Sequence, residues 1–158
     1  MGYIFPCTVA IDPAEEARHQ EAMRRLGVYD GAWALSKVLE HSDVIAGQRR
    51  LLLTGEAVRA SQIPEFYPEL AELREDGLTV MVVDADGREV EVELRYLDSN
   101  KAYRVTGPEW GQLVQETGMA SGDRLDFYTC RYGDCHRCLF MFRTQAAGRP
   151  VVVSGDRT

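Results

Sequence analysis

The sequence contains no apolar run that approaches the roughly 20 residues a helix needs to cross a membrane. Its beginning, residues 1–6, also lacks the basic segment and the long apolar stretch of a secretory signal. Gly2 could begin a myristoylation motif, but Pro6 stands where that motif needs serine or threonine. We therefore expect a soluble, intracellular protein that makes no membrane contact.

Recognisable catalytic motifs are missing as well. The sequence has no phosphate-binding glycine loop, no zinc-protease helix and no nucleophile elbow. It contains three histidines, and no sequence pattern places one of them beside a cysteine as a nucleophile–base pair. We predict that the protein is not an enzyme and that it uses no cofactor.

Basic residues are fewer than acidic ones, with 18 Lys and Arg against 25 Asp and Glu and a net charge of −7. Lys and Arg neutralise phosphates and supply most of the non-specific affinity for nucleic acids. A nucleic-acid-binding function therefore requires the basic residues to gather on one face, with the carboxylates elsewhere. The length and the hydrophobic content of 45% are those of one globular domain.

A helix is predicted over residues 12–27, within an N-terminal extension of residues 1–32. Asp12 can cap this helix, Pro13 suits its first position, and Gly27 can end it. Its apolar residues are small and few, so we expect it to pack on the surface of the domain. A helix that binds a partner protein is the alternative interpretation.

The rest of the chain is dominated by short segments with the pattern of strands. Val90, Val92 and Leu94 alternate with charged residues, which is the period of two that a half-buried strand shows. Strands are predicted at residues 34–39, 50–53, 78–83, 88–96, 103–106, 124–129 and 138–144. Short helices are predicted at residues 56–60 and 108–117.

These segments predict a mainly β domain over residues 33–145, a seven-stranded open barrel with two short helices. Pro64 and Pro68 are expected to break the chain after the first of those helices. The tail, residues 146–158, contains Val151-Val152-Val153 and could add an edge strand.

Three cysteines and a histidine lie close together near the C-terminal end. Cys130, Cys135, His136 and Cys138 offer four ligands of the kind that tetrahedral zinc accepts. The adjacent Cys135 and His136 rarely suit one closed site, and no second paired-cysteine motif exists. Free thiols in a hairpin are the favoured interpretation. A zinc site and a disulfide between Cys130 and Cys138 are the alternatives.

Five segments in a fixed order carry a resemblance to a known family. They are SKVLEHSDV at residues 36–44, RRLLL at 49–53, DSNKAY at 98–103, WGQLV at 110–114 and SGDRLDF at 121–127. In this order and at this spacing they resemble the B3 DNA-binding domain of plant transcription factors. The resemblance implies a seven-stranded open barrel with two short helices, in agreement with the strands predicted above.

The resemblance also implies two arms that grip the major groove of double-stranded DNA, at residues 37–50 and 97–103. Arginine can read guanine and asparagine can read adenine, while serine, lysine and histidine can hold phosphates. By resemblance, the residues that read or approach bases are Arg49, Arg50, Asn100 and Lys101. Those that position the DNA backbone are Lys37, His41, Ser42, Gln48 and Ser99. A role in transcriptional regulation and a place in the nucleus follow from the resemblance alone.

The chain departs from the family pattern in both arms. After Arg50-Leu51 the family often continues with Val-Ile-Pro-Lys, whereas residues 52–55 read Leu-Leu-Thr-Gly here. Asp98 stands where many members carry asparagine, and its carboxylate would face phosphates. The alternative function is therefore a diverged B3 fold that has no DNA affinity and serves as a protein-interaction module.

Overall fold

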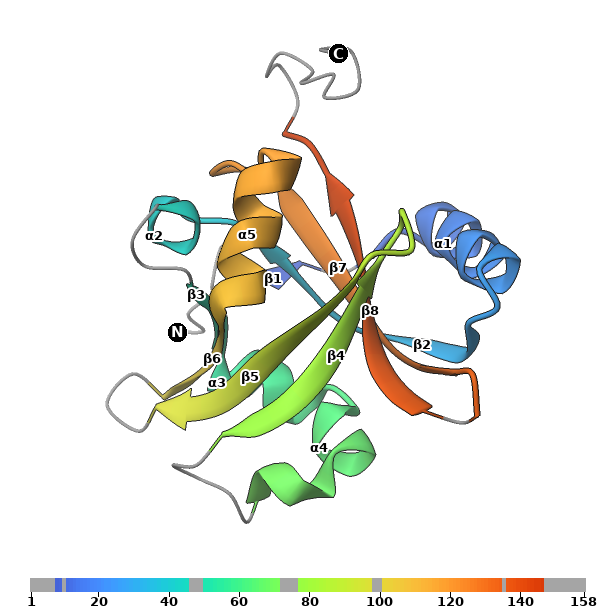
Figure 1. The fold of residues 1–158 in the computed structure, drawn as a ribbon, viewed down its shortest axis with the longest axis horizontal. Helices are drawn as coiled ribbons and strands as arrows, with labels where there is room; N and C mark the ends of the chain where they lie inside the picture. Colours follow the sequence, from blue (N-terminus) through green and yellow to red (C-terminus); the bar gives the residue numbers. More distant parts are fainter. Residues whose placement is uncertain are drawn as a thin grey trace.

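The computed structural model describes residues 8–9, 11–45, 50–71, 77–97, 101–134 and 136–146. Over these residues the chain forms one curved eight-stranded sheet in the order β1-β2-β7-β8-β4-β5-β6-β3 (Figure 1). The strands are β1 (Thr8–Val9), β2 (Tyr29–Val38), β3 (Arg50–Thr54), β4 (Leu78–Asp84), β5 (Glu89–Leu97), β6 (Ala102–Thr106), β7 (Arg124–Tyr132) and β8 (His136–Thr144). The prediction of a mainly β, open barrel is confirmed, and the two-residue β1 is an addition to it.

Neighbouring strands run antiparallel except for β4 and β8, which are parallel. Two strands are longer than predicted. Tyr29 pairs with Arg131, so β2 begins five residues before the predicted start at residue 34. Likewise Tyr132 pairs with His136, so β7 and β8 extend beyond the predicted end at residue 129 and the predicted start at residue 138. Pairing along the whole length of the β7–β8 hairpin extends these strands beyond their local sequence signals.

Short helices lie between the strands, and three of them, α2, α4 and η1, were not predicted. The helices are α1 (Pro13–Arg25), α2 (His41–Val44), α3 (Gly55–Ala60), α4 (Ile63–Phe66), α5 (Pro108–Thr117) and the 3-10 turn η1 (Pro68–Ala71). The first helix ends at Ala60, before the prolines, as expected, but the prolines lie in the first turns of further short helices, Pro64 in α4 and Pro68 in η1. Proline suits the first turn of a helix, where its missing N–H would have had no partner.

The main hydrophobic core fills the inside of the barrel, and α5 closes one end of it (Figure 1). Trp110 and Leu113 of α5 point into this core and are each 1% exposed. Gly118 ends the helix in the left-handed conformation, with φ of 69°, which glycine adopts without a steric cost. The apolar stripe of α5 is thus the reason why a ten-residue helix sits across the barrel opening.

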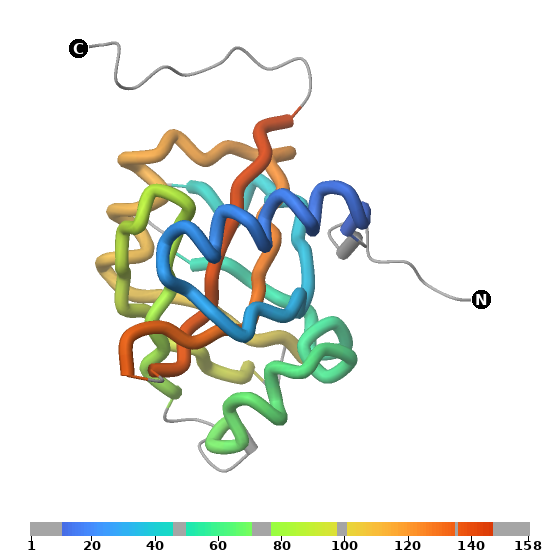
Figure 2. The backbone as a smooth tube through the Cα atoms, turned by 90° about the vertical axis from the view of Figure 1, so that its right-hand side faces the viewer, coloured from blue at the N-terminus to red at the C-terminus, as the bar shows by residue number. Residues whose placement is uncertain are grey.

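Helix α1 packs on the outside of the barrel, where it crosses β7 and β8 (Figure 2). Met23 is the buried residue of α1 and joins a second apolar cluster with Tyr128 and Phe142. His19 stacks on the Phe142 ring with centroids 3.9 Å apart, and its Nδ1 lies 3.0 Å from the Tyr128 hydroxyl. Burial disfavours the charged imidazole and lowers the pKa of His19. The expected packing of this helix on the domain surface is confirmed.

A buried polar network holds α1 to the sheet. Asp126 is fully buried, accepts a hydrogen bond from the Ser36 hydroxyl and pairs with Arg124 at 3.2 Å. Arg124 pairs in turn with Glu15 of α1, and this contact lowers the pKa of the Glu15 carboxyl. The carboxylates of Glu15 and Asp126 also lie near His19. The Arg124 guanidinium pairs with both carboxylates, so their negative charge is balanced by a side chain of the protein itself.

None of the helices that the structure describes has both the length and the apolar character needed to span a bilayer. The edge strand considered for Val151-Val152-Val153 lies outside the described residues, as does Asp98 in the second arm.

Candidate nucleic-acid interface

The first arm is the connection from the end of β2 to the start of β3, and it contains α2. At its base the Leu39 N–H donates to the Asp123 carbonyl at 2.8 Å, and the Gly122 N–H donates to the Leu39 carbonyl at 2.9 Å. These bonds tie the arm to the turn before β7. In α2, His41 is exposed and Ser42 is partly buried. Both lie on the arm to which they were assigned.

Lys37 does not face the solvent as its predicted phosphate contact requires. Its side chain is 5% exposed, and its Nζ lies 3.0 Å from a carboxylate oxygen of Asp43, which is itself 2% exposed. The same ammonium donates to the Leu52 carbonyl. This burial and pairing argue against the predicted contact of Lys37 with a phosphate.

The second arm is the connection between β5 and β6, of which the structure describes Lys101. Lys101 is exposed, and its backbone has a left-handed φ of 49°. Its carbonyl accepts a hydrogen bond from the Gly55 N–H at 2.9 Å. A Cβ on Gly55 would lie 2.8 Å from that carbonyl oxygen, so this close approach requires glycine. The departure from the family pattern at Gly55 thus serves to hold the second arm.

Between the two arms lies the outer face of three neighbouring strands, β5, β6 and β3. Along β3 and β5 burial alternates, so every second side chain points outward. Arg95 pairs in register with Arg104, and Arg104 with Leu52, so these three side chains share the outer face. In the next row Glu93, Thr106 and Arg50 share it in the same way.

Where β5, β6 and β3 pair with one another, this outer face is basic although the chain is acidic; farther along β5 it carries Glu89 and Glu91. The two rows between the arms contain three arginines and one glutamate, which is 3 − 1 = +2, in a chain of net charge −7. Lys101 adds a further positive charge at the second arm. Arg50 lies at one end of the β3–β6 pairing and Lys101 one residue beyond the other end, about 17 Å away along the strands at the rise of a strand. We call Arg50, Arg95, Arg104 and Lys101 the basic face.

The members of the basic face differ in how their charge is engaged. Arg95 pairs with Glu93 at 3.2 Å, a contact in which both side chains stay well exposed. Arg104 forms no ion pair with any described residue, and its Nε is buried without a hydrogen-bond partner there. Arg104 therefore presents the least compensated guanidinium of the face. Sequence reasoning missed Arg95 and Arg104, although the alternation within residues 93–97 contains a signal for the outward side.

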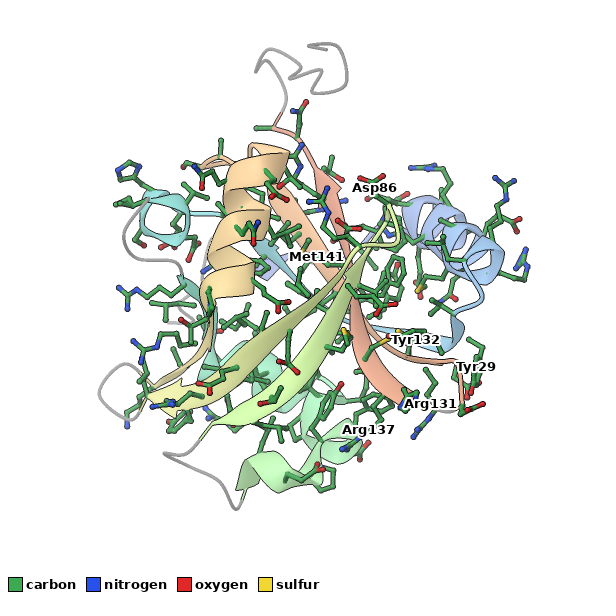
Figure 3. The ribbon with its side chains drawn as sticks, in the orientation of Figure 1. Tyr29, Asp86, Arg131, Tyr132, Arg137 and Met141 are labelled. Carbon is green, nitrogen blue, oxygen red and sulfur yellow. The ribbon has the colours of Figure 1, made fainter. Side chains whose placement is uncertain are left out.

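A second group of arginines lies on the far side of the molecule, around Arg131 and Arg137 (Figure 3). The Arg137 guanidinium donates to Glu69 at 2.6 and 3.0 Å and lies over the Tyr67 ring, and this pairing lowers the pKa of Glu69 to about 2. Arg131 lies over the ring of Phe66 at 5.1 Å. These contacts engage both arginines within the protein, so this group is a weaker candidate for binding phosphates.

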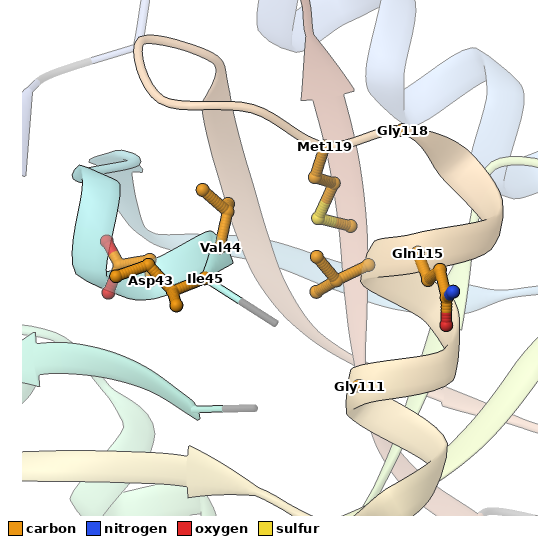
Figure 4. A pocket seen from close by; sticks show the side chains of 8 residues that line it. Asp43, Val44, Ile45, Gly111, Gln115, Gly118 and Met119 are labelled. Atoms are coloured by element: carbon orange, nitrogen blue, oxygen red, sulfur yellow. The ribbon is translucent and has the colours of Figure 1, made fainter. Parts of the chain in front are cut away.

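A pocket of about 310 Å³ opens beside the first arm, between α2 and α5 (Figure 4). Its wall is largely apolar and includes Ile45, which is 37% exposed, and Met119. Gly111 and Gly118 leave room on the α5 side. The pocket separates the first arm from α5, so contacts other than α5 must hold that arm in place.

The two cysteines that the structure describes, Cys130 and Cys138, do not gather with His136. Cys130 and Cys138 are opposite each other on β7 and β8, fully buried, with their Sγ atoms 3.0 Å apart. Both are free thiols. His136 is exposed at the start of β8, and Cys135 lies outside the described residues. The two buried thiols belong to the apolar cluster under α1, which favours the interpretation as free thiols over a shared zinc site.

Four predicted site residues, Gln48, Arg49, Ser99 and Asn100, lie outside the described residues. Of the others, the structure places His41, Ser42 and Arg50 on the first arm or at its end and Lys101 on the second.

No family model and no curated protein matches the sequence. Among solved structures, the chain is similar to the Arabidopsis FUS3–DNA complex, with a TM-score of 0.53 and 21% identity over 73% of this chain and 100% of that one. It is also similar to the complex of the Arabidopsis thaliana transcription factor LEC2 with DNA, with a TM-score of 0.57 and 20% identity over 75% of this chain and 97% of that one. Both are B3-domain transcription factors, and the likeness shows that this chain has a B3-like fold, as predicted.

Proposed function

We propose that this B3-like barrel binds double-stranded DNA sequence-specifically and acts in transcriptional regulation in the nucleus. The observation that carries the proposal is the basic face between the two arms, with three arginines and Lys101 on one side of an acidic chain. Clustered positive charge on one face is the electrostatic requirement for binding a phosphate backbone. That both similar structures are complexes with DNA supports the same function.

In this proposal the two arms enter the major groove, and the middle of the basic face, Arg95 and Arg104, lies against the DNA backbone. Arg49, Arg50, Asn100 and Lys101 read or approach base edges. His41, Ser42, Gln48 and Ser99 position the backbone. Arg95 and Arg104 are added to the set as phosphate contacts, because they lie between the arms on the outer face.

The test is selection from a random duplex pool, followed by binding to the selected duplex at several salt concentrations. We expect an enriched sequence motif and an affinity that falls as salt rises, because bound phosphates release counterions. Arg50→Ala should weaken binding. Arg25→Ala is the matched control, since Arg25 is 77% exposed on α1, on the side of the barrel opposite β3 (Figure 1).

The result that would overturn the proposal is the absence of any enriched motif together with the absence of salt-sensitive binding. The net charge of −7 would then favour the alternative, a B3-like fold that works through protein contacts.

A further inference from the structure

The free edge of the sheet beside the first arm is closed by two side chains. Within the described part of the chain, β3 is an end strand of the sheet and pairs only with β6. On its other edge the Leu52 N–H donates to the Asp43 carboxylate at 3.3 Å, and the Leu52 carbonyl accepts from the Lys37 ammonium. Lys37 comes from β2 and Asp43 from α2. Side chains thus take the place of a strand along this part of the edge.

The two side chains form one buried ion pair, which we call the Lys37–Asp43 bridge. Lys37 Nζ lies 3.0 and 3.2 Å from the two carboxylate oxygens of Asp43. The oxygen at 3.0 Å, Oδ2, also accepts the Glu40 N–H at 2.8 Å, at the start of α2. The bridge therefore joins three parts of the arm: the end of β2, the helix α2 and the strand β3.

A buried ion pair of this kind is poorly explained by stability alone. Removing two charges from water costs about as much as their attraction returns, so an apolar pair of similar size is often as stable. The retained charges do, however, demand one geometry, because each must find its partner and its hydrogen bonds. α2 has four residues, too few to hold its own shape, and the pocket between α2 and α5 leaves that side of it without close support.

We propose that the Lys37–Asp43 bridge is a positioning element, which sets the direction in which the first arm leaves the barrel toward DNA. Neither side chain contacts DNA in this proposal. The bridge fixes the base of the arm, so that His41, Ser42 and Arg50 are presented to DNA in one arrangement. This inference rests on the proposed DNA-binding function and concerns sequence specificity rather than general affinity.

The test is the paired substitution Lys37→Gln with Asp43→Asn. It replaces the two charged groups by neutral amides of similar size, which can still donate and accept hydrogen bonds. We expect affinity for the selected duplex to fall about tenfold or more, while affinity for a random duplex changes less than about twofold. The basic face is intact in this variant, so the slope of affinity against salt for the random duplex should be unchanged.

The matched control is Asp126→Asn, which removes another fully buried carboxylate, from the network that holds α1. This control should lower thermal stability without changing the ratio of the two affinities. A loss of that ratio in both variants would mean that general destabilisation, and not positioning, is responsible, and would overturn the inference.

A measurement on the unaltered protein covers the case in which the paired variant fails to fold. Hydrogen exchange of the Leu52 amide should be as slow as that of the paired strands β6 and β7, although β3 is an edge strand. Exchange at the rate of an exposed amide would overturn the inference.

The two proposals fail in different ways. If the unaltered protein selects no duplex, DNA binding fails and the positioning role falls with it. If it binds a selected duplex and the paired variant binds both duplexes equally well, only the positioning role is wrong.

Discussion

Arg104 offers the sharpest test of the basic face, because its position was found from the structure and not from the family pattern. It lies in the middle of the face, between Arg95 on β5 and Leu52 on β3. No described residue neutralises its guanidinium, so a DNA phosphate is the partner that the proposal supplies. The perturbation is Arg104→Ala.

The expected magnitude follows from counterion release. Each phosphate contact contributes a slope of about −0.9 to the plot of log affinity against log salt. Losing the Arg104 contact should therefore make the slope less steep by about 0.9, and lower the affinity about 8-fold near 0.1 M salt and about 4-fold near 0.2 M salt. The free energy of unfolding should change little, because the buried Nε of Arg104 has no hydrogen-bond partner to lose among the described residues.

The assay is fluorescence anisotropy of a labelled duplex at several salt concentrations, for the unaltered protein, Arg104→Ala and Arg25→Ala. Both variants change the net charge by the same amount, so a general electrostatic effect would appear in both. The reasoning is refuted if the two variants lose affinity equally, or if Arg104→Ala weakens binding without changing the slope.

The remaining predictions concern the second arm and the packing of α1. Gly55→Ala should weaken DNA binding and lower the free energy of unfolding by about 1–3 kcal/mol, because the added Cβ would meet the Lys101 carbonyl oxygen at 2.8 Å. The anisotropy assay measures the binding and urea unfolding measures the stability. Unchanged affinity and stability would contradict this account of Gly55. The pKa of His19 is lowered by burial, so the unfolded chain binds the proton more readily and stability should fall as pH drops below about 6.5. Urea unfolding between about pH 7.5 and pH 5.5 should show that loss, and His19→Gln should reduce it; an equal pH dependence in both proteins would assign it to other groups.

Local patterns predicted many of the elements well. Helix α5 spans Pro108–Thr117, the predicted range, because proline at its start, glycine after its end and an apolar stripe all act within ten residues. The strand β5 was predicted from its period of two. The short helices at Pro64 and Pro68 were not predicted, since a proline that begins a helix and one that ends a segment look alike in sequence.

Whether a predicted site residue can contact DNA depends on the direction in which its side chain points. Lys37 was predicted to contact a phosphate because it belongs to a polar arm. Its ammonium instead binds Asp43 and the Leu52 carbonyl, six and fifteen residues further along the chain, and is buried. Arg95 and Arg104 were overlooked because no local pattern reveals that they face each other across two strands. Strand register, which depends on the whole sheet, decides that juxtaposition.

The sequence by itself determined the class of fold, through period-two strands, helix end signals and an order of segments that resembles B3 domains. Tertiary structure alone decided which charges are free and which are engaged. A lysine has the same chemistry in any sequence, but its availability to a phosphate depends on burial and on partners from distant segments. For this chain that distinction takes Lys37 out of the proposed DNA surface and brings Arg104 into it.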